Sequence, residues 1–100
     1  MADENSNKRS ASTRSKRRVV AKNVCRLRNE RGWTQQDLAE RARIDRTHLA
    51  RFESQGVNVS LDVLFRLAEG LEVDTRELLE GIDEVASATD DDAEPPDGPD

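Results

Sequence analysis

Apolar residues between positions 19 and 79 recur every three or four positions, which is the spacing of one face of an α-helix. The pattern predicts helices at about 19–31, 34–42, 45–53 and 60–71, and a short fifth helix at about 74–79. No segment alternates as a β-strand does, so we predict an all-α fold, a compact bundle of five helices. The residues expected to face its core are Val20, Val24, Leu27, Trp33, Leu38, Ala39, Ala42, Ile44, Leu49, Phe52, Leu61, Leu64, Leu67, Ala68 and Leu71.

The residues at the predicted helix ends are suited to capping them. Thr34 and Asp37 have the spacing of a capping box, in which each side chain bonds the backbone N–H of the other residue. Gly32 stands where a C-cap glycine would end the first helix. Three further helices begin after a residue that favours the N-cap, namely Asp45, Ser60 and Asp74.

The helix predicted at 45–53 combines an apolar face with small, basic and hydrogen-bonding residues. Its residues outside the apolar face are Arg46, Thr47, His48, Ala50 and Arg51. Side chains of these kinds suit a helix that enters the DNA major groove. The alternative is an ordinary helix pair with a solvated outer face. The closely spaced caps together with the basic face favour the DNA-binding interpretation.

The segment from about Val20 to Leu79 resembles the Cro- and lambda-repressor-like (XRE-family) helix-turn-helix domains. The resemblance rests on Gln35 with Ala39 four residues later, and on the apolar positions that follow: Ile44, Leu49, Phe52 and those of SLDVLFRLAEGLEVD at 60–74. The chain departs from the family at Arg43, where relatives carry Gly, and at Val59, where many carry Pro. If Arg43 is left-handed, as that glycine is, its side chain costs about 1 kcal/mol.

The resemblance implies a sequence-specific regulator of transcription that binds double-stranded DNA and reads the major groove with the helix at about 45–53. A homodimer on a two-fold symmetric operator is also implied, with Leu79 and Ile82 as candidate contacts. Three residues match positions that reach base edges in relatives: Arg46, Thr47 and Arg51. The residues expected on the DNA backbone are Gln35, Arg43, His48, Asn58, Arg17 and Arg18. Arg28 and Glu53 match a structural ion pair of the family.

Charge is unevenly distributed along the chain, whose formal net charge is −5. Residues 1–18 carry a net charge of +4, residues 19–81 of −1, and residues 82–100 of −8. Neither end contains enough apolar residues to offset the entropy of ordering it. We therefore predict a disordered basic arm at 1–18, a helix-turn-helix domain at 19–82 and a disordered acidic tail at 83–100. The tail either competes with phosphates for the basic residues or only increases solubility.

The residues that catalysis or metal binding would need are scarce. Cys25 is the only cysteine and His48 the only histidine, and no Gly-rich phosphate-binding loop is present. We therefore expect no enzyme activity, metal, cofactor or small-molecule ligand. No apolar run could span a membrane or act as a secretory signal. We expect a cytoplasmic, nucleoid-associated protein of a prokaryote, phage or plasmid.

The alternative function is a protein-interaction module, an antitoxin or adaptor built on the same scaffold. The acidic tail and the negative net charge favour this alternative. The basic face of the helix at 45–53 argues against it. Binding to duplex DNA distinguishes the two functions.

Overall fold

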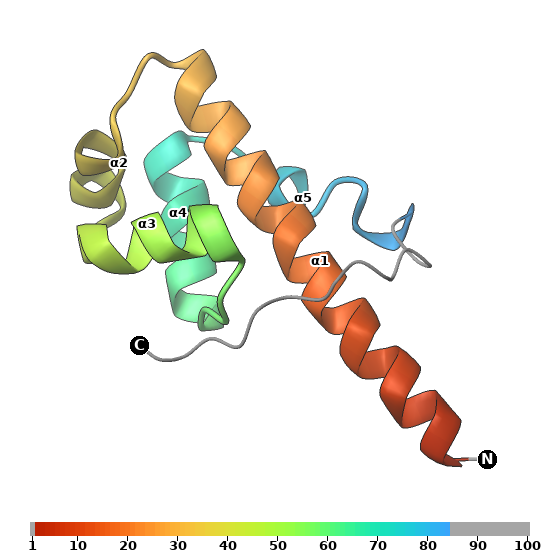
Figure 1. Cartoon of the computed structure of the whole chain (residues 1–100). Coiled ribbons are helices and arrows are strands. Elements are labelled where there is room, and N and C mark those ends of the chain that lie inside the picture. The colour runs from red at the N-terminus through yellow and green to blue at the C-terminus, as the bar shows by residue number, and fades with distance from the viewer. Residues whose placement is uncertain (1, 85–100) are drawn as a thin grey trace.

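The computed structural model describes residues 2–84, and all regular structure within that range is helical. Helix α1 spans Ala2–Glu30, α2 Gln35–Ala42, α3 Arg46–Gln55, α4 Leu61–Leu71 and α5 Thr75–Leu78, and a 3₁₀ turn, η1, spans Ile82–Glu84. The helices α3, α4 and α5 pack along the C-terminal half of α1, and α2 packs against α3 and α4 (Figure 1). The predicted five-helix, all-α fold is therefore confirmed. None of the described helices is long and apolar enough to cross a membrane.

Local hydrogen bonds explain where the helices begin. The Asp37 amide donates to Thr34 Oγ1 at 3.0 Å, and the Thr34 amide donates to Asp37 Oδ2 at 2.9 Å, which completes the predicted capping box of α2. Asp45 caps α3 by accepting from the His48 amide at 3.0 Å. Ser60 and Asp74 are the N-cap residues of α4 and α5. These caps satisfy N–H groups that the first turn of a helix leaves without a partner.

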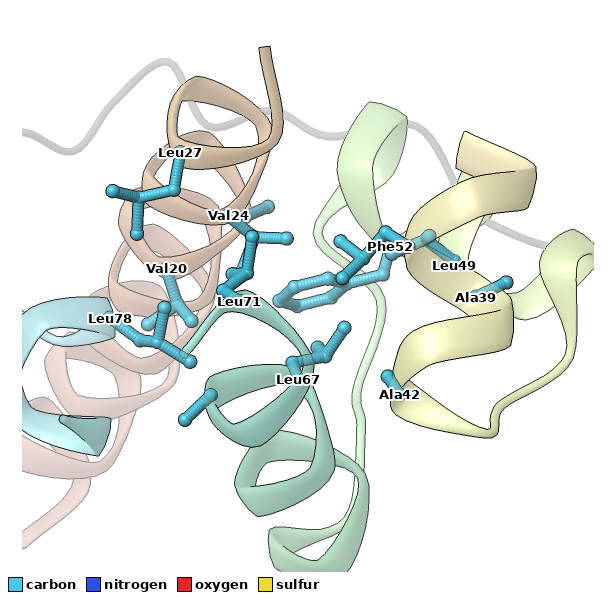
Figure 2. Close-up of a cluster of buried hydrophobic side chains, with 13 residues drawn as sticks. Val20, Val24, Leu27, Ala39, Ala42, Leu49, Phe52, Leu67, Leu71 and Leu78 are labelled. Atoms are coloured by element: carbon cyan, nitrogen blue, oxygen red, sulfur yellow. The ribbon is translucent and has the colours of Figure 1, made fainter. Parts of the chain in front are cut away.

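The core lies between α1, α2, α3 and α4 and includes Leu78 of α5. Figure 2 shows the Phe52 ring extending from α3 toward Leu67 and Leu71 of α4. All three side chains are almost completely buried, as the periodicity predicts. α4 and α2 approach closely at Gly70 of α4, where a Cβ atom would lie 3.0 Å from the backbone nitrogen of Ala42. The absence of a side chain at Gly70 therefore lets α2 and α4 pack closely together.

The prediction that Leu61 faces the core is wrong, because its side chain is 66% exposed. Leu61 is the first residue of α4, whereas the buried residues Leu67, Ala68 and Leu71 lie in the second half of the helix. Phe65, one turn after Leu61, is 46% exposed. α4 thus presents two large apolar side chains to solvent.

The N-terminal segment forms the first part of α1. Residues 2–18, expected to form a disordered arm, continue α1, whose first half extends beyond the other helices (Figure 1). No Gly or Pro precedes Gly32, and a docked helix extends at little cost once its first turn exists. Residues 14–18 are half-buried, so contacts with the rest of the domain begin before position 19. Most of the predicted acidic tail, residues 85–100, lies outside the described residues.

Candidate nucleic-acid interface

Helix α3 separates an apolar side from a basic side. Leu49 and Phe52 are buried in the core. Arg46, Thr47 and Arg51, the three residues predicted to reach base edges, are all exposed. Two further residues of the helix, His48 and Ala50, are half-buried. Packing of the apolar side against the bundle therefore turns the three predicted residues outward together.

The turn between α2 and α3 has the shape that glycine gives it in relatives. Arg43 is left-handed, with φ 61° and ψ 47°, and its side chain is exposed. The Ile44 amide donates to Ala39 O at 2.9 Å and the Arg43 amide to Glu40 O at 3.2 Å, so the end of α2 is closed as in a Schellman motif. These bonds hold an arginine in a conformation that costs about 1 kcal/mol without glycine. The turn therefore keeps the left-handed geometry that suits glycine, and Arg43 adds a positive charge to it.

A hydrogen-bonded ion pair joins α1 to α3 and α2. Arg28 donates to Glu53 through Nε and Nη2, both at 2.9 Å, and through Nη1 to Trp33 O at 2.8 Å. The two side chains are only 12% and 4% exposed. Gln35 Nε2 donates to Glu53 Oε1, also at 2.9 Å, at the first residue of α2. The hydrogen bonds that Arg28 donates to Glu53 raise the pKa of Arg28 above its ordinary value. This network fixes the relative angle of the two helices of the motif.

Trp33 connects the loop before α2 to the far end of that helix. The Arg41 guanidinium lies 3.9 Å from the centre of the indole ring, and that of Arg31 lies 5.9 Å from it. Trp33 itself is half-buried against the core. Stacking of this kind contributes about 0.5–1 kcal/mol at an exposed site. The sequence predicts a core position for Trp33, but not its arginine partners.

The linker between α3 and α4 is held by α1. Arg17 Nε donates to Gly56 O at 2.9 Å, and the Arg18 side chain packs against Gly56. Asn58, predicted to bind phosphate, is exposed on this linker. Sequence reasoning assigns both arginines to a basic arm and misses this contact, because 39 residues separate Arg17 from Gly56.

Among the residues that the structure describes, no group of three His, Cys, Asp or Glu side chains is placed to hold a metal ion. His48 lies on α3, near the predicted base-contact residues. Cys25 is half-buried on α1, with its sulfur 3.7 Å from Arg28 Nη2. Within residues 2–84 the features of chemical interest are therefore the exposed cations of α3 and the residues that orient that helix.

A protein-family model described as helix-turn-helix matches residues 26–78, which include all of α2, α3 and α4. The chain belongs to this family. It is 33% identical over 73 residues to an HTH-type transcriptional regulator, y4dJ, of Sinorhizobium fredii, covering 73% of this chain and 95% of that protein. It is also 33% identical over 63 residues to a hypothetical transcription factor of Neisseria meningitidis, covering 63% of this chain and 59% of that protein.

Solved structures of restriction-modification controller proteins share the fold. C.AhdI of Aeromonas hydrophila superimposes with a TM-score of 0.59 at 31% identity, covering 62% of this chain and 94% of that one. Wild-type C.Esp1396I gives a TM-score of 0.61 at 29% identity, covering 68% of this chain and 88% of that one. The resemblance to the XRE-type helix-turn-helix domains is thereby confirmed, and the chain is a DNA-binding regulator of transcription. The family is regulatory rather than enzymatic.

Proposed function

We propose that the chain binds a two-fold symmetric operator as a homodimer and inserts α3 into the major groove. Arg46, Thr47 and Arg51 read base edges in this proposal. An arginine can bond guanine in bidentate fashion, and the threonine methyl can pack against that of thymine. The observation that carries the proposal is the joint exposure of these three residues on a helix whose other side is buried.

Backbone contacts are proposed for the residues that flank α3. Gln35 lies at the N-terminal end of α2, where helix N–H groups favour a phosphate, and its amide has a second N–H besides the one bonded to Glu53. His48 and Asn58 offer side-chain N–H donors on either side, and the exposed Arg43 adds charge at the turn. Together these groups would place α3 in register with the bases.

Arg17 and Arg18, the last two residues of the expected arm, are also proposed to approach the DNA backbone. Two terminal nitrogens of Arg17 remain beyond the Nε atom that bonds Gly56. A phosphate contact would therefore be compatible with that bond. The salt dependence of binding measures whether either arginine makes such a contact.

The dimer contact is proposed to lie on α4 rather than at Leu79 and Ile82. Those two residues are half-buried and packed against the core. Leu61 and Phe65 instead form an exposed apolar pair, of the kind that marks an interface. Beside them on α4 are the exposed Asp62 and Arg66, whose opposite charges a two-fold axis can bring together across an interface.

Sedimentation equilibrium tests the dimer. Phe65→Ser, which removes the larger apolar group, should raise the dimer dissociation constant at least tenfold, about 1.4 kcal/mol. Glu77→Ser, on α5 and exposed, is the control and should leave the constant unchanged. A Phe65→Ser protein that dimerises like the wild type would show that the copies associate elsewhere.

A selection from random duplex DNA, followed by binding measurements on operator variants, tests base recognition. Arg51→Ala should lose about 1–3 kcal/mol, concentrated at one base pair. Arg76→Ala removes an exposed arginine from α5 and serves as the charge-matched control. A uniform loss over all operator variants would make Arg51 a phosphate contact. No binding to any duplex at low salt would favour the protein-interaction module instead.

A further inference from the structure

Helix α1 contacts the C-cap of the proposed recognition helix, Gly56, as well as Glu53 in its last turn. Gly56 is the C-cap of α3, with φ 66°, and its own N–H donates to Phe52 O at 2.8 Å. Its carbonyl accepts from Arg17 Nε at 2.9 Å. The positive charge of Arg17 is also attracted to the partial negative charge at the C-terminus of α3. Arg17 therefore bonds the end of α3 from a position 39 residues earlier in the chain.

Arg18, the next residue of α1, packs against Gly56 of the linker. A Cβ atom at Gly56 would lie 3.0 Å from Arg18 Cγ and 3.4 Å from its Cα, so a side chain there would crowd Arg18, and the positive φ of Gly56 also favours glycine. Gly56 is itself buried. The contact between α1 and the linker is consequently a packed one, in which the position of Gly56 depends on two neighbouring residues of α1.

The position of Gly56 governs groups that the proposed function uses. Arg51 lies five residues before it on α3, and Asn58 lies two residues after it on the linker. Val57 and Val59, on either side of Asn58, pack partly against the core. A shift or fraying at Gly56 would therefore move the last turn of α3 and the linker together.

We propose that Arg17 is a positioning residue for DNA recognition, which orients the end of α3 and the linker carrying Asn58 through its hydrogen bond to Gly56. This inference rests on the proposed function. It assigns the effect of Arg17 on binding chiefly to the N–H group at Nε, whereas a phosphate contact would depend on the charge of the side chain.

Two substitutions separate the N–H group from the charge. Arg17→Gln removes the charge but keeps an N–H donor, because glutamine Nε2 is the same number of bonds from Cα as arginine Nε. Arg17→Met has a similar length and has neither donor nor charge. We expect Arg17→Met to weaken operator binding about five- to tenfold and Arg17→Gln less than about twofold. Lys16→Gln removes one charge at the preceding residue and should resemble Arg17→Gln.

The slope of log affinity against log salt shows whether Arg17 acts through a phosphate contact instead. If a phosphate contact accounted for the whole effect of Arg17, the Gln and Met variants would lose affinity equally, and both slopes would fall by about 0.9. That outcome overturns the inference but leaves the proposed function intact. Failure of the wild-type protein to bind any duplex would overturn both.

Hydrogen exchange of the DNA-free protein checks the same contact without relying on DNA. In Arg17→Met, the amides of Gly56, Val57 and Asn58 should exchange at least about threefold faster than in wild type, while those of α5 stay unchanged. Arg17→Gln should restore the wild-type rates. Exchange that is identical in all three proteins would show that Arg17 does not hold the linker.

Discussion

Substitution of Glu53 tests whether the hydrogen bonds that join Arg28 and Gln35 to Glu53, near the C-terminal end of α3, stabilise the fold. Glu53→Ala would remove three hydrogen bonds of 2.9 Å, two from Arg28 and one from Gln35. The Arg28 side chain, which is 12% exposed in the wild type, would keep only Trp33 O as an oxygen acceptor. A buried cation without its counter-ion loses most of the attraction that offsets its desolvation.

The expected loss is large for a chain of this size. Breaking one side of a buried ion pair costs about 3–5 kcal/mol, and the partial exposure of Arg28 places Glu53→Ala near 3 kcal/mol. A domain this small has about 5–15 kcal/mol of stability in all. The melting temperature should accordingly fall by about 12–24 °C. Glu30→Ala breaks the exposed Arg26–Glu30 pair at 3.3 Å and should change stability by less than about 0.5 kcal/mol.

Urea unfolding followed by circular dichroism provides the measurement. The double variant Arg28→Met/Glu53→Leu should recover most of the stability lost in Glu53→Ala, because it leaves no buried charge. It should still bind operator more weakly than wild type, since Gln35 loses its anchor. A Glu53→Ala protein within about 1 kcal/mol of wild type would refute the reasoning, because only solvent-exposed pairs contribute so little.

Three further outcomes are expected. Gly70→Ala should lower stability by about 1–2 kcal/mol despite alanine's better helix propensity, because its Cβ would meet the Ala42 backbone at 3.0 Å; a raised urea midpoint would contradict this. The hydrogen bond from the Thr34 backbone amide lowers the pKa of Asp37 below its usual 3.8. The Asp37 carboxylate therefore stabilises the fold above about pH 4, and this stabilisation is lost as the pH falls through the lower pKa of the folded state. In Asp37→Asn, the part of the pH dependence of the urea midpoint that Asp37 causes should be absent. Ending the chain at Ile82 should tighten non-specific DNA binding at low salt more than operator binding, unless the acidic tail is only a solubilising segment.

Helix positions and their caps were predictable because their causes are local. The capping box of Thr34 and Asp37 needs only the spacing between them, and the buried stripe of α1 needs only the helical period. The left-handed Arg43 followed from the glycine at that position in relatives. Glu72 is also left-handed, at φ 62°, and no local signal pointed to it.

Exposure on α4 was less predictable, because periodicity identifies an apolar face without showing how far the other helices cover it. Leu61 has the spacing of a core residue, yet it stands at the start of α4 and remains exposed. Phe65 lies on the side of α4 away from Leu67 and Leu71. Which apolar residues remain for a partner depends on the packing of α2 and α4, and this is a property of the assembled bundle.

The basic residues before position 19 show why charge alone does not identify a partner. A cation in a polar segment predicts exposure to water and attraction to phosphate, and composition predicts that the segment is disordered. A backbone carbonyl at a helix C-terminus attracts the same group, but Gly56 comes near Arg17 only after α3 has folded against α1. The same positive charge can therefore act on DNA directly, through phosphate, or indirectly, through the orientation of α3. The Gln and Met substitutions at Arg17 distinguish these two roles, because only one of them depends on the N–H group at Nε.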